Sequence, residues 1–112
     1  MPSDAIDPGE LHEVLQALQH ARTLLDELVV RGVRAAGPAE LGRLDALREE
    51  LGRVGARHLA EQLRALADAM RADDPAATRG LLCAQTSLYL FDRVLTLRVV
   101  ERGLVEAMEA GA

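Results

Sequence analysis

Apolar residues recur three and four positions apart along most of this chain, and this spacing constrains the fold more than any other feature. The first series contains Leu11, Val14, Leu18, Ala21, Leu25 and Leu28. Because an α-helix turns once in about 3.6 residues, such spacing gathers apolar side chains on one side of a helix. The next two series contain Leu41, Leu44, Leu47, Leu51 and Val54, then Ala56, Leu59, Leu63, Leu66 and Met70. The chain is therefore predicted to be all-α.

The residue types agree with that prediction. The 112 residues include 20 Leu and 19 Ala, but only nine Val and one Ile. Leu and Ala are good helix formers, whereas β-branched residues favour strands. A chain of this length corresponds to one domain. We expect a single helical domain over residues 1–112, in which residues 1–7 form a flexible N-terminal tail.

Proline and glycine mark the ends of the first predicted helix. Asp7 and Glu10 have the spacing of a capping box, and Pro8 suits the first helical position. Gly37-Pro38 is predicted to end this helix, because a residue that precedes proline is pushed out of the helical region.

The middle of the chain contains a predicted break. The two middle apolar series do not share one register across Gly52 and Gly55, which indicates helices over about residues 38–52 and 56–72. One helix bent at these glycines is the alternative. Asp73-Asp74-Pro75 then predicts a stop and a new start, with Asp74 as the N-cap. The predicted fold is a small antiparallel helical bundle of three long helices, the middle one broken near residues 52–56, which makes four helices in all.

The last predicted helix runs to about Ala110, a length of roughly 50 Å at 1.5 Å per residue. Its apolar residues cover more than one face, which is typical of a helix that a bundle or a partner surrounds. The other helices are too few to cover its whole length. Leu90, Leu97 and Leu104 recur every seven residues, the period of a coiled-coil seam. These leucines are the predicted interface, and the expected partner is a second copy of the chain or another helical protein.

The core is expected to consist of residues on the inner side of each helix. Its predicted members are Leu15, Leu18, Leu25, Leu44, Leu51, Leu63, Leu66, Leu88, Phe91 and Leu95. Cys83 stands in an apolar run and is predicted to be a buried, unreactive thiol. The hydroxyls of Thr86 and Ser87 are expected to bond back to their own helix. The alternative for this polar patch is that Gln85 sets the register between two copies.

Charge and composition exclude several classes of function. The formal net charge is −5, and Tyr89 and Phe91 are the two aromatic residues. We therefore expect no binding to nucleic acid. Six Arg and four acidic residues share residues 31–57. Local ion pairs on a solvated surface are the expected role of these arginines, and an acidic partner segment is the alternative.

Membrane insertion and secretion are not expected either. The most apolar stretch, residues 80–100, contains Asp92, Arg93 and Arg98, which argues against a membrane span. The chain does not open with a basic and then apolar signal segment. All 13 basic residues are Arg, which is typical of a GC-rich genome. A cytoplasmic bacterial protein is the expectation.

Few residues are suited to chemistry. The single cysteine cannot form an internal disulfide or join a Cys-rich zinc site. His12 and His20 are eight residues apart, and His58 lies in another predicted helix. Since a metal site needs several converging ligands, no metal and no cofactor are expected.

Arg53 and His58 have an Arg-x4-His spacing, which resembles the motif of HEPN-type helical ribonucleases. The resemblance implies that Arg53 would hold an RNA phosphate and that His58 would move a proton. Val54 stands where that family commonly has a polar residue, and Gly55 interrupts the helix between the pair. We therefore take a ribonuclease or toxin domain as the alternative function.

The segment from Gly37-Pro38 to Ala67 resembles helical regions that accompany bacterial SWIM zinc-finger proteins. It shares a Gly-Pro opening, a leucine ladder, a glycine break and a Leu-Ala helix. The zinc finger itself is absent. The resemblance implies an accessory helical module and assigns no site residues. The predicted function is a non-catalytic helical protein-interaction or scaffold subunit.

Overall fold

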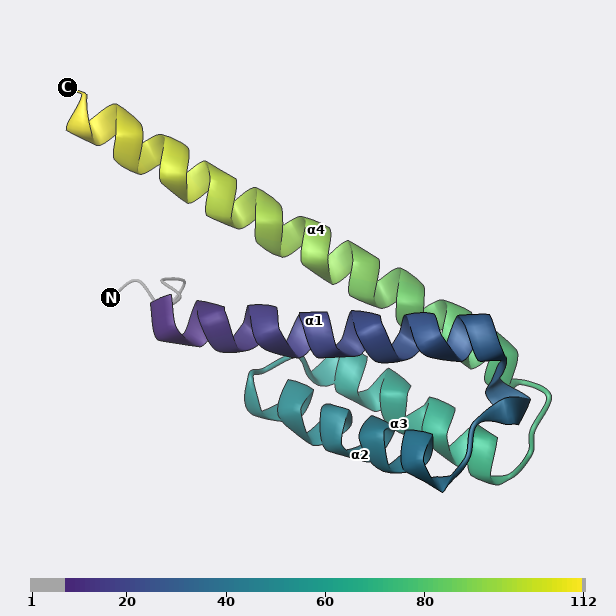
Figure 1. Cartoon of the computed structure of the whole chain (residues 1–112). Helices are drawn as coiled ribbons and strands as arrows, with labels where there is room; N and C mark the ends of the chain where they lie inside the picture. The colour runs from purple at the N-terminus through teal and green to yellow at the C-terminus, as the bar shows by residue number, and fades with distance from the viewer. Residues whose placement is uncertain (1–7, 112) are drawn as a thin grey trace.

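The computed structural model describes residues 8–111, which form helices joined by short turns (Figure 1). The elements are α1 (Pro8–Arg31), a short 3-10 helix η1 (Val33–Ala35), α2 (Pro38–Arg53), α3 (Arg57–Arg71) and α4 (Ala77–Ala110). The described part of the chain contains no strand. The all-α class and the four α-helices are therefore confirmed. The predicted cap at Asp7 and the predicted tail over residues 1–7 lie outside the described residues.

The first helix ends earlier than predicted. α1 stops at Arg31, because Gly32 adopts a φ of +86°, a conformation that residues with a Cβ rarely adopt. η1 then leads to Gly37-Pro38, which opens α2 instead of ending α1. The Glu40 carboxylate accepts a hydrogen bond from the Gly37 N–H at 3.0 Å and so caps the start of α2.

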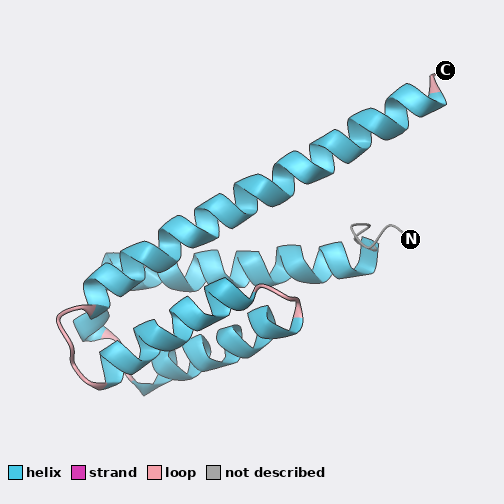
Figure 2. Ribbon diagram, turned by 180° about the vertical axis from the view of Figure 1, so that it is seen from behind, coloured by secondary structure: helices cyan, strands magenta, loops and turns pink. Residues whose placement is uncertain are grey.

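The break between the middle helices is confirmed, and it reverses the chain. Gly55 has a φ of +89°, and the N–H of Ala56 donates to the carbonyl of Leu51 at 2.9 Å. The N–H of Gly55 donates to the carbonyl of Gly52 at 3.2 Å, which completes a Schellman motif. α2 and α3 consequently pack side by side as two separate helices (Figure 2), which corrects the view of one long helix with a break.

Each helix reverses the direction of the one before it, so α1 packs against both α2 and α4, and α3 does the same. Exposed ion pairs join the helices at their edges. Arg43 on α2 pairs with Glu27 on α1 at 2.7 Å, and Arg22 on α1 pairs with Asp92 on α4 at 2.8 Å. The interior consists of Leu with some Ala and Val, and no polar side chain is buried there among the described residues.

Eight of the ten predicted core residues are buried, and the two exceptions share one cause. Leu15 remains 44% exposed although it lies on the side of α1 that faces α4, seven residues before Arg22. Phe91 remains 37% exposed. Gly80 lies against Leu66, and α3 and α4 are antiparallel, so Phe91 comes level with the start of α3. Both side chains lie where α4 leaves its neighbours.

α4 extends well beyond the bundle (Figures 1 and 2). Its last buried residue is Leu95, and every residue from 96 to 111 is exposed. The molecule measures 59 × 22 × 18 Å, with a radius of gyration of 16.5 Å, against about 13 Å for a compact domain of about 100 residues. Within residues 8–111, no helix combines the length and the apolar character needed to cross a bilayer.

The start of α4 is close to the prediction. The Asp74 carboxylate accepts a hydrogen bond from the Ala76 N–H at 2.9 Å. The helix begins at Ala77, so its N-cap is Ala76 and not the predicted Asp74. Pro75 lies in the preceding turn and not in the first helical turn.

Candidate interaction surface on the last helix

Most of the large apolar side chains that are exposed in the described residues lie along α4. They include all three leucines of the predicted interface: Leu90, Leu97 and Leu104 are 55%, 60% and 59% exposed. We define the outward stripe as these leucines and the apolar residues three or four positions from one of them that are also more than half exposed. Its members are Leu90, Val94, Leu97, Val100, Leu104 and Met108.

The outward stripe lies on the side of α4 that faces away from the bundle. Leu90 and Leu97 follow the buried residues Leu88 and Leu95 by two positions. Two positions correspond to about 200° around a helix axis, so the stripe lies opposite the core-facing side. The core of this chain therefore cannot cover it.

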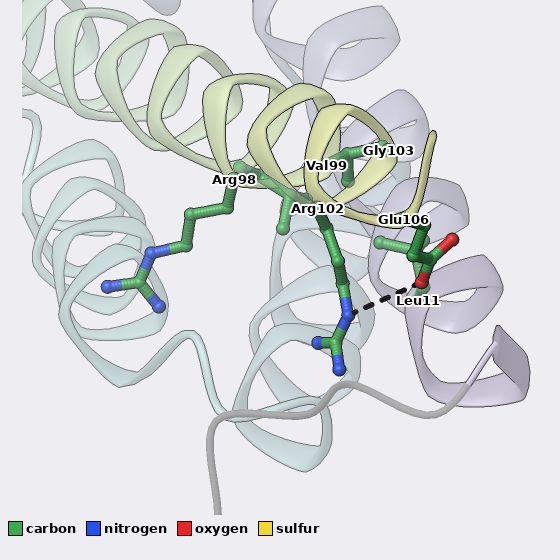
Figure 3. A pocket seen from close by; sticks show the side chains of 7 residues that line it. Leu11, Arg98, Val99, Arg102, Gly103 and Glu106 are labelled. Carbon is green, nitrogen blue, oxygen red and sulfur yellow. Dashed lines mark ion pairs between the residues drawn. The ribbon is translucent and has the colours of Figure 1, made fainter. Parts of the chain in front are cut away.

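The core-facing side of α4 changes character after Leu95. Continuing the spacing of the buried residues leads to Val99, Arg102 and Glu106, and the last two form an i,i+4 ion pair at 3.9 Å. With Leu11 of α1 these residues line an open groove of about 260 Å³, in which Arg98 and Arg102 extend from α4 (Figure 3). Beyond the core, the inner side of α4 thus becomes charged, whereas its outward side stays apolar.

One basic and one acidic residue flank the centre of the outward stripe. Arg93 stands four residues before Leu97, and Glu101 four residues after it. The Arg93 Nη1 donates to the Tyr89 hydroxyl at 3.2 Å, and its guanidinium lies 5.9 Å from the centre of the Tyr89 ring. Within residues 8–111, neither Arg93 nor Glu101 takes part in an ion pair. Both charges are exposed beside the apolar residues.

Cys83 belongs to the same surface, which corrects the prediction of a buried thiol. It is exposed, because Leu81 and Ala84 occupy the buried positions of that turn. Cys83 stands seven residues before Leu90 and so continues the heptad of the leucines. Spacing also indicates the members of the stripe that the prediction omitted, since Val94 and Val100 stand three residues on either side of Leu97.

The polar patch near the start of α4 makes contacts within the chain. Thr86 Oγ1 donates to the carbonyl of Leu82 at 2.9 Å, the predicted bond back to its own helix. The Gln85 side-chain amide donates to the Asp26 carboxylate at 3.4 Å and so joins α4 to α1. Gln85 therefore faces α1. No contact of Gln85 within the described residues supports the alternative, in which this residue sets the register between two copies.

The structure does not bring Arg53 and His58 into one groove. Arg53 is the last residue of α2, His58 is the second residue of α3, and the turn at Gly55 separates them. Both are exposed. Arg53 lines an open groove of about 430 Å³ between α1 and α2, in which His20 Nδ1 lies 2.9 Å from a Glu50 carboxylate oxygen. His58 does not line that groove. The ribonuclease alternative stays a prediction.

Two of the six arginines within residues 31–57 form ion pairs in the described part of the chain. Arg31 pairs with Glu40 at 3.2 Å, and Arg43 pairs with Glu27. The hydrogen bond from Arg43 is the main cause that lowers the pKa of Glu27, and the same bond raises the pKa of Arg43. Among residues 8–111, no three His, Cys, Asp or Glu side chains come together as a metal site.

Comparison with protein-family models, with curated proteins and with solved structures gave no match for this chain. The resemblance of residues 37–67 to helical regions that accompany SWIM zinc-finger proteins stays a prediction.

Proposed function

We propose that this chain is a non-catalytic helical interaction subunit and that a second copy of the chain covers the outward stripe. The proposal rests on the change in the inner side of α4 after Leu95, while the outward side stays apolar. Up to Leu95 the inner side of the helix is apolar because it packs on the core. Beyond that residue the inner side carries Arg98, Arg102 and Glu106, yet Leu97 and Leu104 remain on the outward side. A contiguous apolar surface of this kind on a protein usually marks an interface.

The exposed area is large enough for a dimer. The chain exposes 7597 Å². A compact monomer of 12.1 kDa exposes about 6,000 Å², so the excess is about 1,600 Å². A stable protein interface needs about 800 Å² from each partner. The seven-residue period of the three leucines is the period with which two helices pack along each other.

The test is the molar mass in solution, measured by sedimentation equilibrium over a wide range of concentration. The wild type is expected at twice 12.1 kDa. Leu97→Glu places a charge in the centre of the stripe in both copies and is expected to give a monomer. Val30→Glu is the matched control, since Val30 is 86% exposed on α1, away from the stripe. This variant is expected to remain dimeric.

Two results would overturn the proposal. A wild type that stays monomeric at every concentration excludes a second copy as the occupant and leaves only a different helical chain. A Leu97→Glu variant that remains dimeric while its circular dichroism matches the wild type places the dimer contact elsewhere on the surface.

A further inference from the structure

We infer that the two copies of α4 pair in antiparallel orientation, with the two-fold axis near Leu97. This inference rests on the proposed function and names the geometry of the same surface. In this arrangement residues 96–110 of one copy lie along residues 84–98 of the other.

The outward stripe has the same pattern in both chain directions. Val94 and Val100 stand three residues before and after Leu97, and Leu90 and Leu104 stand seven residues before and after it. All five are more than half exposed. When one helix is reversed about Leu97, apolar residues again meet apolar residues at each of these levels. The reversed copy therefore fits the stripe along most of its length.

The charges beside the stripe distinguish the two orientations. A parallel pair in register sets Arg93 beside Arg93 of the other copy, and Glu101 beside Glu101, which is unfavourable at both levels. An antiparallel pair centred on Leu97 brings Arg93 of one copy to the level of Glu101 of the other, and does so twice. Both groups are free of ion pairs within the described chain, so each is available for this contact. Opposite charges beside a seam set the orientation of paired helices.

The shape of the molecule favours the same orientation. Residues 77–95 of α4 are fixed to α1 and α3 by buried residues such as Leu81 and Leu88. Every residue from 96 to 111 is exposed, so this half of the helix has no support from the core. Antiparallel pairing lays each unsupported half on a half that the partner's core holds in place. Parallel pairing would join the two unsupported halves only to each other.

Cysteine crosslinking tests the orientation, and the wild type already carries a useful probe. At 1.5 Å per residue, the antiparallel pair separates the two copies of Cys83 by about 42 Å along the helix axis. A disulfide needs Cα atoms within about 7 Å. A parallel pair in register sets the two Cys83 residues side by side. We therefore expect mild oxidation of the wild-type dimer to produce no intermolecular disulfide.

A pair of variants supplies the positive signal. Leu90→Cys and Leu104→Cys are each made in a Cys83→Ala background and shown to be dimeric by sedimentation. Neither is expected to crosslink alone, because like positions lie about 21 Å apart in the antiparallel pair. Their mixture is expected to form a disulfide that joins position 90 of one copy to position 104 of the other.

Crosslinking of the wild type through Cys83, or of Leu90→Cys alone, would overturn the inference and assign the parallel orientation. A mixture of dimeric variants that fails to crosslink would overturn it as well. Both results leave the dimer itself intact, whereas a monomeric wild type in sedimentation removes the proposed function.

Discussion

At the scale of single residues, Glu40 shows how one side chain fixes the start of a helix. Its carboxylate accepts the N–H of Gly37 at 3.0 Å and pairs with Arg31 at 3.2 Å. Hydrogen bonds from the backbone N–H groups of Glu40 and Gly37 lower the pKa of this carboxyl below its ordinary value of 4.5. A pKa that is lower in the folded state means that the unfolded state binds the proton more tightly. The stabilisation is then full above about pH 4.5 and is lost as the pH falls through the lowered pKa.

We expect Glu40→Gln to be less stable than the wild type at pH 7. The difference should shrink at about pH 3, where the wild-type carboxyl also becomes neutral. Urea unfolding at the two pH values measures this difference. Glu49→Gln is the control, since Glu49 is exposed and forms no ion pair within residues 8–111. An equal loss of stability at both pH values would show that the charge of Glu40 does not matter.

Arg93 and Glu101 carry a second prediction, which concerns the dimer. Arg93→Glu sets two acidic groups at the same level of an antiparallel pair, twice in each dimer. Exposed charge pairs contribute about 0.2–1 kcal/mol each, so we expect the dissociation constant to rise about tenfold. The double variant Arg93→Glu with Glu101→Arg restores opposite charges and should regain most of the affinity. If the double variant binds no better than Arg93→Glu alone, the two groups do not meet across the interface.

Arg53 and His58 are the residues on which the ribonuclease alternative depends. Both are exposed, and a turn separates them, so replacing each with Ala should change the free energy of unfolding by no more than about 0.5 kcal/mol. A scaffold subunit is expected to remain dimeric with both residues replaced. Incubation of the wild type with labelled RNA is expected to give no cleavage. Cleavage by the wild type that both replacements abolish, with the fold retained, would favour the alternative.

At the scale of whole elements, two glycines next to each other in space behave differently. Gly55 has a φ of +89°, whereas Gly52 lies within α2, and an added Cβ would meet no atom at either position. Backbone conformation alone therefore separates them. Gly55→Ala should destabilise the protein by about 1–2 kcal/mol, the cost of a left-handed conformation for a residue with a Cβ.

Gly52→Ala is the matched variant and should stabilise the protein by about 0.5–1 kcal/mol, since Ala favours helix interiors. Denaturant unfolding of the two variants measures both effects. Equal effects of the two substitutions would mean that the Schellman motif at Gly55 does not end α2.

The sequence predicts elements well where a local signal decides their ends. Gly55 and Gly37-Pro38 act through backbone geometry, and the bounds of α2 and α3 agree with the prediction within one residue. The predicted end of α1 was wrong, because the prediction placed the stop at Gly37-Pro38, and Gly32, which ends the helix, has no neighbouring proline to mark it. The left-handed backbone of Gly32 ends α1, and η1 then packs against α1 and α4 before Pro38 opens α2.

At the scale of the whole molecule, the divergence of α4 from α1 cannot be predicted from the sequence. Apolar residues cover both sides of α4 up to Leu95, so periodicity alone cannot decide which side meets the core. Leu90, Leu97 and Leu104 could be predicted as one surface because their spacing is local. The exposure of Leu15, Phe91 and Cys83 could not be predicted, because it depends on the length over which α1 and α3 pack against α4.

The last prediction concerns the complete dimer, in which the folding of each chain is coupled to the pairing of the two copies. If a second copy covers the outward stripe, mass action makes thermal stability depend on protein concentration. For two chains of this size that unfold together, we expect the melting midpoint to rise by about 3 °C for each tenfold increase in concentration. Leu97→Glu should melt at a lower temperature that does not change with concentration, because its unfolding involves one chain.

Circular dichroism at 222 nm follows this transition because most described residues are helical. The control is again Val30→Glu, whose midpoint should rise with concentration as that of the wild type does. A wild-type midpoint that stays constant from micromolar to near-millimolar protein would contradict the dimer. In that case residues 96–110 would have to persist as an exposed helix without support from a second copy, although isolated helices of about 15 residues are marginal in water.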